Sequence, residues 1–318
     1  MKWHKLGKIF DPIQFSLPND CINFAQSPQT LVFDDYVRIY FSTRALDKDG
    51  KFLSHIAFVD MRKNLRDIIH VADKTVISLG GLGCFDEHGI FPFNVLRHGD
   101  LVYGYTCGWS RRISVSVDTA IGLAISHDDG LTFKRIGDGP VLAASLHEPY
   151  LVGDGSVKIV GDTFHMWYIF GTGWKQYVFD AMPDRTYKIG HAVSKDGIQW
   201  VKDEAQQIIS DKLGVDESQA LPTVIKIDGR YHMFFCYRQS FDFRKNKDRS
   251  YRIGHAWSDD IQSWTRDDEN PQIKGTPNEW DSDMQCYPHV FECDNQVYLL
   301  YNGNEFGRNG FGLAKLEL

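Results

Sequence analysis

Residues 222–235, with the sequence PTVIKIDGRYHMFF, predict a β-hairpin. An apolar, β-branched stretch comes first and a stretch rich in aromatic residues comes last. Between them, Asp228-Gly229 is a pair typical of a tight turn. Working outward from this hairpin shows how the rest of the chain is organised.

The same pattern occurs four more times along the chain. Each copy has one small residue, usually proline, just ahead of its first apolar stretch. We take these markers to be Pro28, Pro92, Ser156, Pro222 and Pro288. They recur about every 65 residues, which indicates an array of similar units that must pack together to bury their apolar faces.

Each unit continues past its hairpin into two further strands. The third strand is rich in small residues, as in Ile189-Gly190-His191-Ala192, and a turn from Ser194 to the aromatic Trp200 leads into the fourth. His191 and His255 recur at one place in the third strand, and we expect both to be core histidines. Each unit is therefore predicted to be a four-stranded antiparallel meander.

Five such units predict an all-β fold, a five-bladed β-propeller formed as one domain by residues 1–318. The last unit lacks a fourth strand, and residues 1–10 match it in their distance from the next marker. We therefore expect the N-terminal strand to close the ring on the last blade. Two stacked β-sandwich domains are the rival interpretation, but they do not explain this match.

Charge and composition narrow the function classes. The net charge of −7 argues against a nucleic-acid partner, because such a protein needs a basic stripe. No apolar run is long enough for a signal peptide or a membrane span, so we expect no membrane insertion and a cytoplasmic location. The six cysteines have no C-x-x-C pairing, which indicates free thiols and gives no reason to expect a zinc site.

Carboxylates gather just before the markers, where the inner strands of a propeller begin at one mouth of the ring. The second unit carries Asp86 and Glu87, the third Asp154, the fourth Glu217 and the fifth Asp283. Facing carboxylates are what glycoside hydrolysis needs, one as proton donor and one as base or nucleophile. We expect Glu217 as the acid and Asp86, Asp154 or Asp283 as the base, with Glu87 a further candidate. The alternative is that they cap turns or repeat a structural feature of an ancestral blade.

Side chains suited to binding a substrate lie at the same predicted rim. Aromatic rings could stack on sugar faces, and basic or amide groups could bind hydroxyls, a carboxylate or a phosphate. The aromatic candidates are Trp109, Trp174, Tyr237 and Trp280. The polar candidates are Arg44, Arg111, Arg238, His88, His147, His289 and Asn304. We assign no metal, although a divalent cation on the axis near His289 stays open.

With these features the chain resembles the five-bladed propeller glycosidases, which include arabinanases, xylosidases, invertases, levansucrases and mannoside phosphorylases. The hairpin repeat and the turn from Ser194 to Trp200 carry the resemblance over the whole chain. The family's three acids are not matched. Ser27, Gly155 and Ala220 stand where the arabinanase pattern has Asp, Asp and Glu, and the Asn-Asp-Pro of invertases is absent. Similar propellers without those acids occur with bacterial surface-polysaccharide genes, which implies a place in glycan assembly.

We therefore expect a carbohydrate-active enzyme that hydrolyses a glycosidic bond without an organic cofactor. Two alternatives remain at this point. One is a propeller that binds a sugar or a nucleotide sugar without changing it, which the missing acids at Ser27 and Ala220 favour. The other is transfer of the sugar to phosphate or another acceptor, for which Arg44, Arg111 and Arg238 would supply the charge.

Overall fold

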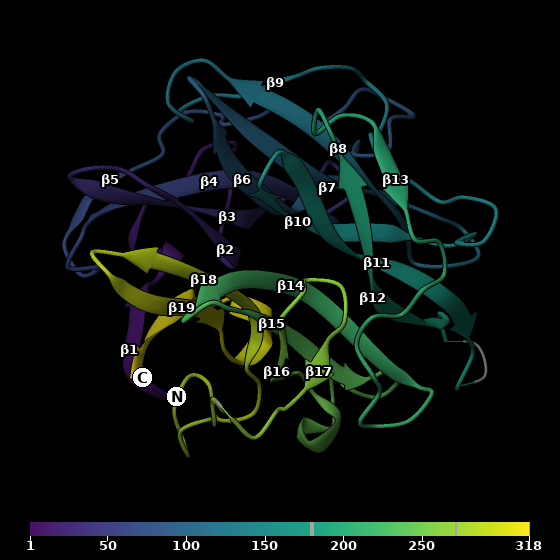
Figure 1. The fold of residues 1–318 in the computed structure, drawn as a ribbon. Helices are drawn as coiled ribbons and strands as arrows, with labels where there is room; N and C mark the ends of the chain where they lie inside the picture. Colours follow the sequence, from purple (N-terminus) through teal and green to yellow (C-terminus); the bar gives the residue numbers. More distant parts are fainter. Residues whose placement is uncertain (179–180, 271, 318) are drawn as a thin grey trace.

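The computed structural model describes residues 1–178, 181–270 and 272–317. These residues form twenty β-strands and three short 3-10 helices, η1 (Pro12–Gln14), η2 (Lys247–Arg249) and η3 (Asn304–Gly307). Figure 1 shows the sheets arranged side by side around the molecule. The prediction of an all-β chain is confirmed. Within the described part, no helix is long and apolar enough to cross a bilayer.

Strand pairing gives three four-stranded antiparallel sheets and one eight-stranded sheet. The eight-stranded sheet consists of two antiparallel meanders joined by one parallel pair, Ser54 with Gly89, so the strands can be described as five meanders of four. The first contains β2 (Gln26–Val32), β3 (Tyr36–Leu46), β4 (Phe52–Arg62) and β5 (Ile68–Val71). The second contains β6 (Gly89–His98), β7 (Leu101–Arg111), β8 (Val117–Ser126) and β9 (Lys134–Arg135). The third contains β10 (Val152–Val160), β11 (Thr163–Lys175), β12 (Asp184–Ser194) and β13 (Trp200–Lys202). The fourth contains β14 (Glu217–Ile227), β15 (Arg230–Gln239), β16 (Arg252–Ser258) and β17 (Thr265–Arg266). The fifth contains β18 (Cys286–Cys293), β19 (Gln296–Asn302), β20 (Phe311–Glu317) and β1 (Lys2–Phe10).

The fifth meander is assembled from both ends of the chain. Strand β1 pairs antiparallel with β20, from Lys2 opposite Glu317 to Phe10 opposite Phe311. Figure 1 shows the purple N-terminal strand beside the yellow C-terminal ones. The first ten residues thus supply the fourth strand that the last repeat lacks.

We call β2, β6, β10, β14 and β18 the inner strands of the five meanders. Each of them has an irregularity at the same place. The register with the second strand skips two residues, and the skipped pairs are 27–28, 91–92, 154–155, 221–222 and 287–288. Such bulges redirect the side chains of a strand, and they are common next to functional sites. The bulge corrects one sequence marker: the third is Gly155 rather than Ser156. Asp154 therefore stands directly before its marker, as Ser27 does in the first meander.

The first residue of the bulge adopts an unusual backbone conformation in four meanders. Ser27, Asp154, Leu221 and Tyr287 have φ between 49° and 56°. This left-handed region costs a side chain with a Cβ about 1–3 kcal/mol, so the surrounding structure must hold these residues in place. Four of the five inner strands therefore have a strained residue at the bulge near their start.

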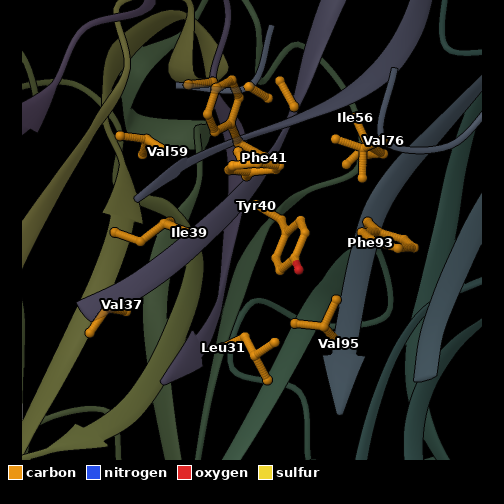
Figure 2. Packing of buried hydrophobic residues seen from close by; sticks show 14 of the residues in the cluster. Leu31, Val37, Ile39, Tyr40, Phe41, Ile56, Val59, Val76, Phe93 and Val95 are labelled. Carbon is orange, nitrogen blue, oxygen red and sulfur yellow. The ribbon is translucent and has the colours of Figure 1, made fainter. Parts of the chain in front are cut away.

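The apolar core lies between neighbouring meanders. One cluster joins the first, second and fifth meanders, and it includes Tyr40, Phe41 and Phe93, which Figure 2 shows. The Tyr40 hydroxyl donates to the carbonyl oxygen of Gly130 at 2.7 Å, which ties the first meander to a turn of the second. Other clusters join the second to the third meander and the third to the fourth and fifth. Each sheet is therefore held by the sheets beside it.

The cysteines match the prediction of free thiols. All six are unpaired, and five are buried while Cys84 is half-buried.

Two buried histidine pairs recur at equivalent places in the third and fourth meanders. His165 Nδ1 lies 3.0 Å from His191 Nε2, and His232 Nδ1 lies 3.0 Å from His255 Nε2. Burial, and then the facing histidine, lowers the pKa of His191 and of His232 to about 4. His191 and His255 are buried, which confirms that they are core histidines.

These pairs predict a loss of stability in mild acid. Because the folded pKa of about 4 is below the unfolded value near 6.5, the unfolded chain binds more protons between these limits. These histidines therefore leave the free energy of unfolding undiminished above about pH 6.5, and they lower it as the pH drops toward 4. Urea unfolding at pH 7.5 and 5.0 should show a smaller loss for His165→Gln than for the wild type. The exposed His147 provides the control variant, His147→Gln, which should lose as much as the wild type; equal losses in all three proteins would contradict the explanation.

Candidate functional site

Four carboxylates that the sequence places near the start of the inner strands form buried ion pairs. In each case the partner is a cation on the outermost strand of the same meander. The pairs are Asp86 with Arg135 at 2.5 Å, Glu148 with Lys202 at 2.7 Å, Glu217 with Arg266 at 2.6 Å and Asp281 with Lys5 at 2.5 Å. All four carboxylate side chains are 0% exposed. We call them the clamp pairs.

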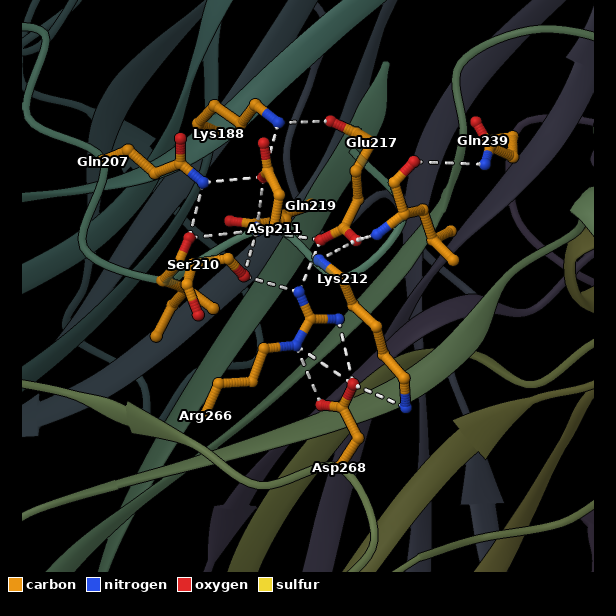
Figure 3. Close-up of polar contacts among 12 residues, drawn as sticks. Lys188, Gln207, Ser210, Asp211, Lys212, Glu217, Gln219, Gln239, Arg266 and Asp268 are labelled. Carbon is orange, nitrogen blue, oxygen red and sulfur yellow. Dashed lines mark hydrogen bonds and ion pairs between the residues drawn. The ribbon is translucent and has the colours of Figure 1, made fainter. Parts of the chain in front are cut away.

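Glu217 shows how fully such a carboxylate is occupied (Figure 3). One oxygen accepts from Arg266 Nη1 at 2.6 Å and from Gln219 Nε2 at 2.9 Å. The other accepts from the backbone amides of Lys212 and Leu213, both at 2.8 Å. Four donors to one buried carboxylate leave no site for a substrate. Glu217 is thus placed to hold a loop rather than to donate a proton.

This geometry corrects the expectation that Glu217 and Asp86 line the mouth. Arg135 donates to Asp86 Oδ2 through both Nε and Nη2, at 3.0 and 2.5 Å. Both carboxylates contact the outer strand of their own meander, and neither lines the central cavity described below. In the first meander the corresponding contact is neutral, since the Thr75 hydroxyl donates to Asn19 Oδ1 at 2.7 Å.

Of the two further predicted acids, Glu87 holds a loop through its carboxylate, whereas Asp283 is exposed. Glu87 accepts from the backbone amide of Gly83 at 2.7 Å and pairs with His88 at 3.2 Å. Asp283 is exposed, and its backbone amide donates to Asn304 Oδ1 at 2.9 Å. The Asn304 side chain also accepts from Met284, so it organises this loop.

The predicted binding residues divide between the rim and the core. At the rim, Arg111 pairs with Asp47 at 2.8 Å, Trp174 lines an adjoining groove, and His147 is exposed. In the core, Tyr237 lies under Arg266, with 4.5 Å between the guanidinium carbon and the ring centroid. Trp280 also lies in the core, where it packs on Tyr301. His289 is buried as well, and its Nε2 accepts from the Thr30 amide at 3.1 Å.

That hydrogen bond occupies Nε2 of His289, whereas its Nδ1 has no partner among the described residues. In residues 1–178, 181–270 and 272–317, no group of three or more histidine, cysteine or carboxylate side chains could hold a metal ion.

A cavity of about 460 Å³ lies beside the bulges near the start of the five inner strands. All five meanders contribute to its wall. The predicted residues Arg44, Trp109, Asp154 and Arg238 line it. Most of the remaining wall is aromatic or aliphatic, and it includes Phe24, Phe52, Phe91, Leu151, Tyr187, Phe243, Tyr251, Tyr287 and Phe306.

Asp154 is the one carboxylate among the described residues of the cavity wall. It occupies the bulge of β10, and its Oδ2 accepts from the Leu221 amide at 3.3 Å. Burial raises the pKa of Asp154 to about 7, against the smaller opposing effects of Leu221 and Arg185. Near neutral pH this carboxyl group is therefore partly protonated and is able to give up a proton.

Three arginines of the third and fourth meanders also line the cavity, namely Arg185, Arg238 and Arg244; we call them the arginine cluster. Arg238 is only 2% exposed, although it donates to no carboxylate in the described chain. It donates to the Tyr187 hydroxyl at 2.9 Å and to the Gln239 carbonyl at 2.8 Å, and its Nε has no partner among the described residues.

The positive charges of the cluster affect one another. Burial, followed by the charges of Arg238 and Arg185, lowers the pKa of Arg244. The nearest carboxylate to Arg244 is Asp184, at 4.0 Å, the limit for an ion pair. The Arg244 side chain is 57% exposed, whereas Arg238 is buried without a carboxylate partner. A buried guanidinium without a counter-charge is costly, so Arg238 makes the cluster suited to an anionic ligand.

Several cavity residues were not predicted, among them Arg185, Tyr187, Arg244 and Tyr251. One repeated spacing would have identified two of them. Thr119, Tyr187 and Tyr251 each stand two residues before the Ile-Gly of a third strand, and all three line the cavity. Arg244 lies in a loop between β15 and β16 for which the repeat offers no register.

The contrast between Glu217 and Asp154 predicts opposite effects on stability. Glu217→Gln leaves Arg266 without its full counter-charge, and breaking a buried pair typically costs about 3 kcal/mol. Asp154→Asn removes a carboxylate whose raised pKa shows that burial disfavours its charge, so stability at pH 8 should stay the same or rise. Thermal and urea unfolding measure both, with Glu87→Gln as a control of the same chemistry. A stable Glu217→Gln protein would show that the clamp pair is dispensable.

Known proteins of similar sequence or structure agree with the fold described above. No known family model matches the chain. It is 34% identical over 325 residues to the uncharacterized proteins MT1551 and Rv1502 of two Mycobacterium tuberculosis strains, with complete coverage of both partners. It is also 28% identical over 141 residues to a β-1,2-mannobiose phosphorylase of Thermoanaerobacter sp., which covers 41% of this chain and 43% of that protein.

Solved structures of similar fold are glycoside hydrolases. One, named only as a glycoside hydrolase, superposes with a TM-score of 0.75 at 18% identity, covering 99% of this chain and 92% of that one. A thermostable family-43 glycoside hydrolase gives 0.66 at 16% identity, with 95% and 93% coverage. The catalytic domain of the Coprinopsis cinerea GH62 α-L-arabinofuranosidase gives 0.65 at 12% identity, with 99% and 96% coverage. The chain therefore has the fold of the propeller-type glycoside hydrolases and belongs to the same family as the two M. tuberculosis proteins.

Proposed function

We propose that this protein breaks a glycosidic bond in the central cavity and transfers the sugar to inorganic phosphate, with Asp154 as the proton donor. The observation that carries the proposal is a single carboxylate facing three arginines in an otherwise apolar cavity. No organic cofactor is needed for this chemistry.

Hydrolysis by two carboxylates, the function first expected from the sequence, fits the cavity less well. That mechanism needs a second carboxyl group about 5 Å away for retention, or about 6.5–9.5 Å away for inversion. Asp154 has no such partner in the described cavity wall, because the candidate partners Asp86 and Glu217 are engaged in clamp pairs. A nucleophile that is already an anion removes the need for a second carboxylate as base.

The proposed reaction balances as follows. A phosphate oxygen forms a bond to the anomeric carbon while the bond from that carbon to the leaving oxygen breaks. Asp154 donates its proton to the leaving oxygen and regains one from solvent or from the bound phosphate. The products are a glycosyl phosphate and a shortened glycan.

The arginine cluster is the part of the cavity suited to the phosphate. Guanidinium groups bind phosphate oxygens through paired N–H donors, and they do so most strongly where water is excluded. Arg238 is fixed for this task by the Tyr187 hydroxyl and by the ring of Phe243, whose centroid lies 3.6 Å from the guanidinium carbon. The partial match to a β-1,2-mannobiose phosphorylase supports the same reaction class.

We further infer that the five meanders are the blades of one closed ring, a single domain of residues 1–318. The pairing of β1 with β20 and the contribution of all five meanders to one cavity support this inference. The free cysteines support a reducing compartment such as the cytoplasm, and a glycosyl phosphate would suit a role in glycan assembly.

A second candidate is a non-catalytic binder of an anionic sugar or nucleotide sugar. The absence of a second carboxylate from the described cavity wall favours it, because binding alone requires no acid and base. Turnover distinguishes the two.

The test is a product screen by mass spectrometry on disaccharides that include β-1,2-mannobiose, with and without phosphate. We expect a glycosyl phosphate only when phosphate is present. General acids contribute about 10²–10⁴-fold, so Asp154→Asn should reduce the rate by that factor. Arg238→Met should mainly raise the KM for phosphate, and Glu87→Gln should change neither. Release of free sugar without phosphate would refute phosphorolysis, and ligand binding without any product would favour the second candidate.

A further inference from the structure

We propose that the sugar bound in the cavity is itself acidic, and that Arg44 recognises its carboxylate or phosphate group. This inference rests on the proposed function, since it concerns the substrate of the same cavity. It separates Arg44 from the arginine cluster and gives it a ligand of its own.

Arg44 lies near the end of β3 in the first meander and lines the cavity. Its Nε donates to Gln26 Oε1 at 2.9 Å. Gln26 is 3% exposed, and its Nε2 donates to the carbonyl oxygen of Phe306 at 2.6 Å, which fixes the amide. The Phe24 ring supports the guanidinium from one side, at 5.8 Å. One nitrogen of Arg44 is thus used to orient the group.

The two terminal nitrogens of Arg44 remain available. Within the described residues they donate to no protein acceptor, and no carboxylate lies within 4.0 Å of the guanidinium. A held guanidinium with both terminal nitrogens open presents the fork that binds two oxygens of one anionic group. A neutral sugar hydroxyl would leave the charge without compensation in a largely apolar cavity.

Arg44 and the arginine cluster reach the cavity from different meanders. It belongs to the first meander, whereas Arg185, Arg238 and Arg244 belong to the third and fourth. Gln26 and Phe306, which hold it, come from the first and fifth meanders.

The charge balance of the cavity also favours a second anion. Four guanidinium groups face it, and Asp154 is the one described carboxylate. A phosphate of charge −2 at the cluster compensates only part of this excess. An anionic group on the sugar would place a further negative charge beside Arg44, where the protein supplies none.

Calorimetric titration of the full chain with matched sugars tests this. The acidic probes are D-glucuronate and D-glucose 6-phosphate, and the neutral probe is D-glucose. The wild type should bind at least one acidic probe about ten-fold or more tightly than glucose, the order expected for a charge-assisted pair. Preference for glucuronate or for the phosphosugar tells a carboxylate from a phosphate as the recognised group.

Variants assign the effect to Arg44. Arg44→Met should lose the preference for the acidic probe while still binding inorganic phosphate, and Arg44→Lys should retain part of it. Arg238→Met should show the converse. The control is Arg97→Met, which removes a charge at the opposite, hairpin end of β6 where Arg97 pairs with Asp129. It should match the wild type.

Each outcome gives a decision. Equal affinity of the wild type for acidic and neutral probes, no binding of any probe, or an unchanged preference in Arg44→Met overturns the inference. If Arg44→Met fails to fold by circular dichroism, Arg44→Lys and Gln26→Met provide the same comparison. Loss of phosphate binding in Arg238→Met together with equal sugar affinities would preserve the proposed function and reject only the acidic sugar.

Discussion

The buried ion pair between a carboxylate near the inner strand and a cation on the outer strand is the interaction on which the rest of this structure depends. The outer strands β9, β13 and β17 are only two or three residues long, so backbone pairing alone holds them weakly. A clamp pair fastens each to the loop at the other side of its meander. The carboxylate is fully buried in all four cases, so removing its cation leaves a buried negative charge without its ion-pair partner.

The clamps also shape the chemistry of the cavity. They hold four acidic side chains against the outer strands, and Asp154 is the one carboxylate among the described residues of the cavity wall. With no second carboxylate nearby, burial rather than repulsion raises the pKa of Asp154 to about 7. The same loops that stabilise the sheets therefore make the cavity a place for anions, which is unusual in a fold associated with paired acids.

Much of the fold could be predicted from the sequence, because hairpin and turn patterns are local and repeat five times. The third marker was misplaced by one residue because Gly155, rather than a proline, follows Asp154 in the bulge. Side-chain direction in the loops was not predictable, since spacing does not tell whether Glu217 faces the centre or Arg266. Arg244 comes from a loop without a repeat, so only the folded chain brings it beside Arg238.

The pairing of β1 with β20 has a consequence for biosynthesis. Lys5 is translated well before its partner Asp281 and the neighbouring strand β20. Strand β1 therefore has no strand to pair with until β20 has also emerged from the ribosome. The first four meanders can form in order as they are synthesised, whereas the fifth must wait for residues 311–317. Contacts of such long sequence separation form slowly, so the pairing of β1 with β20 is expected to come after the other meanders have formed.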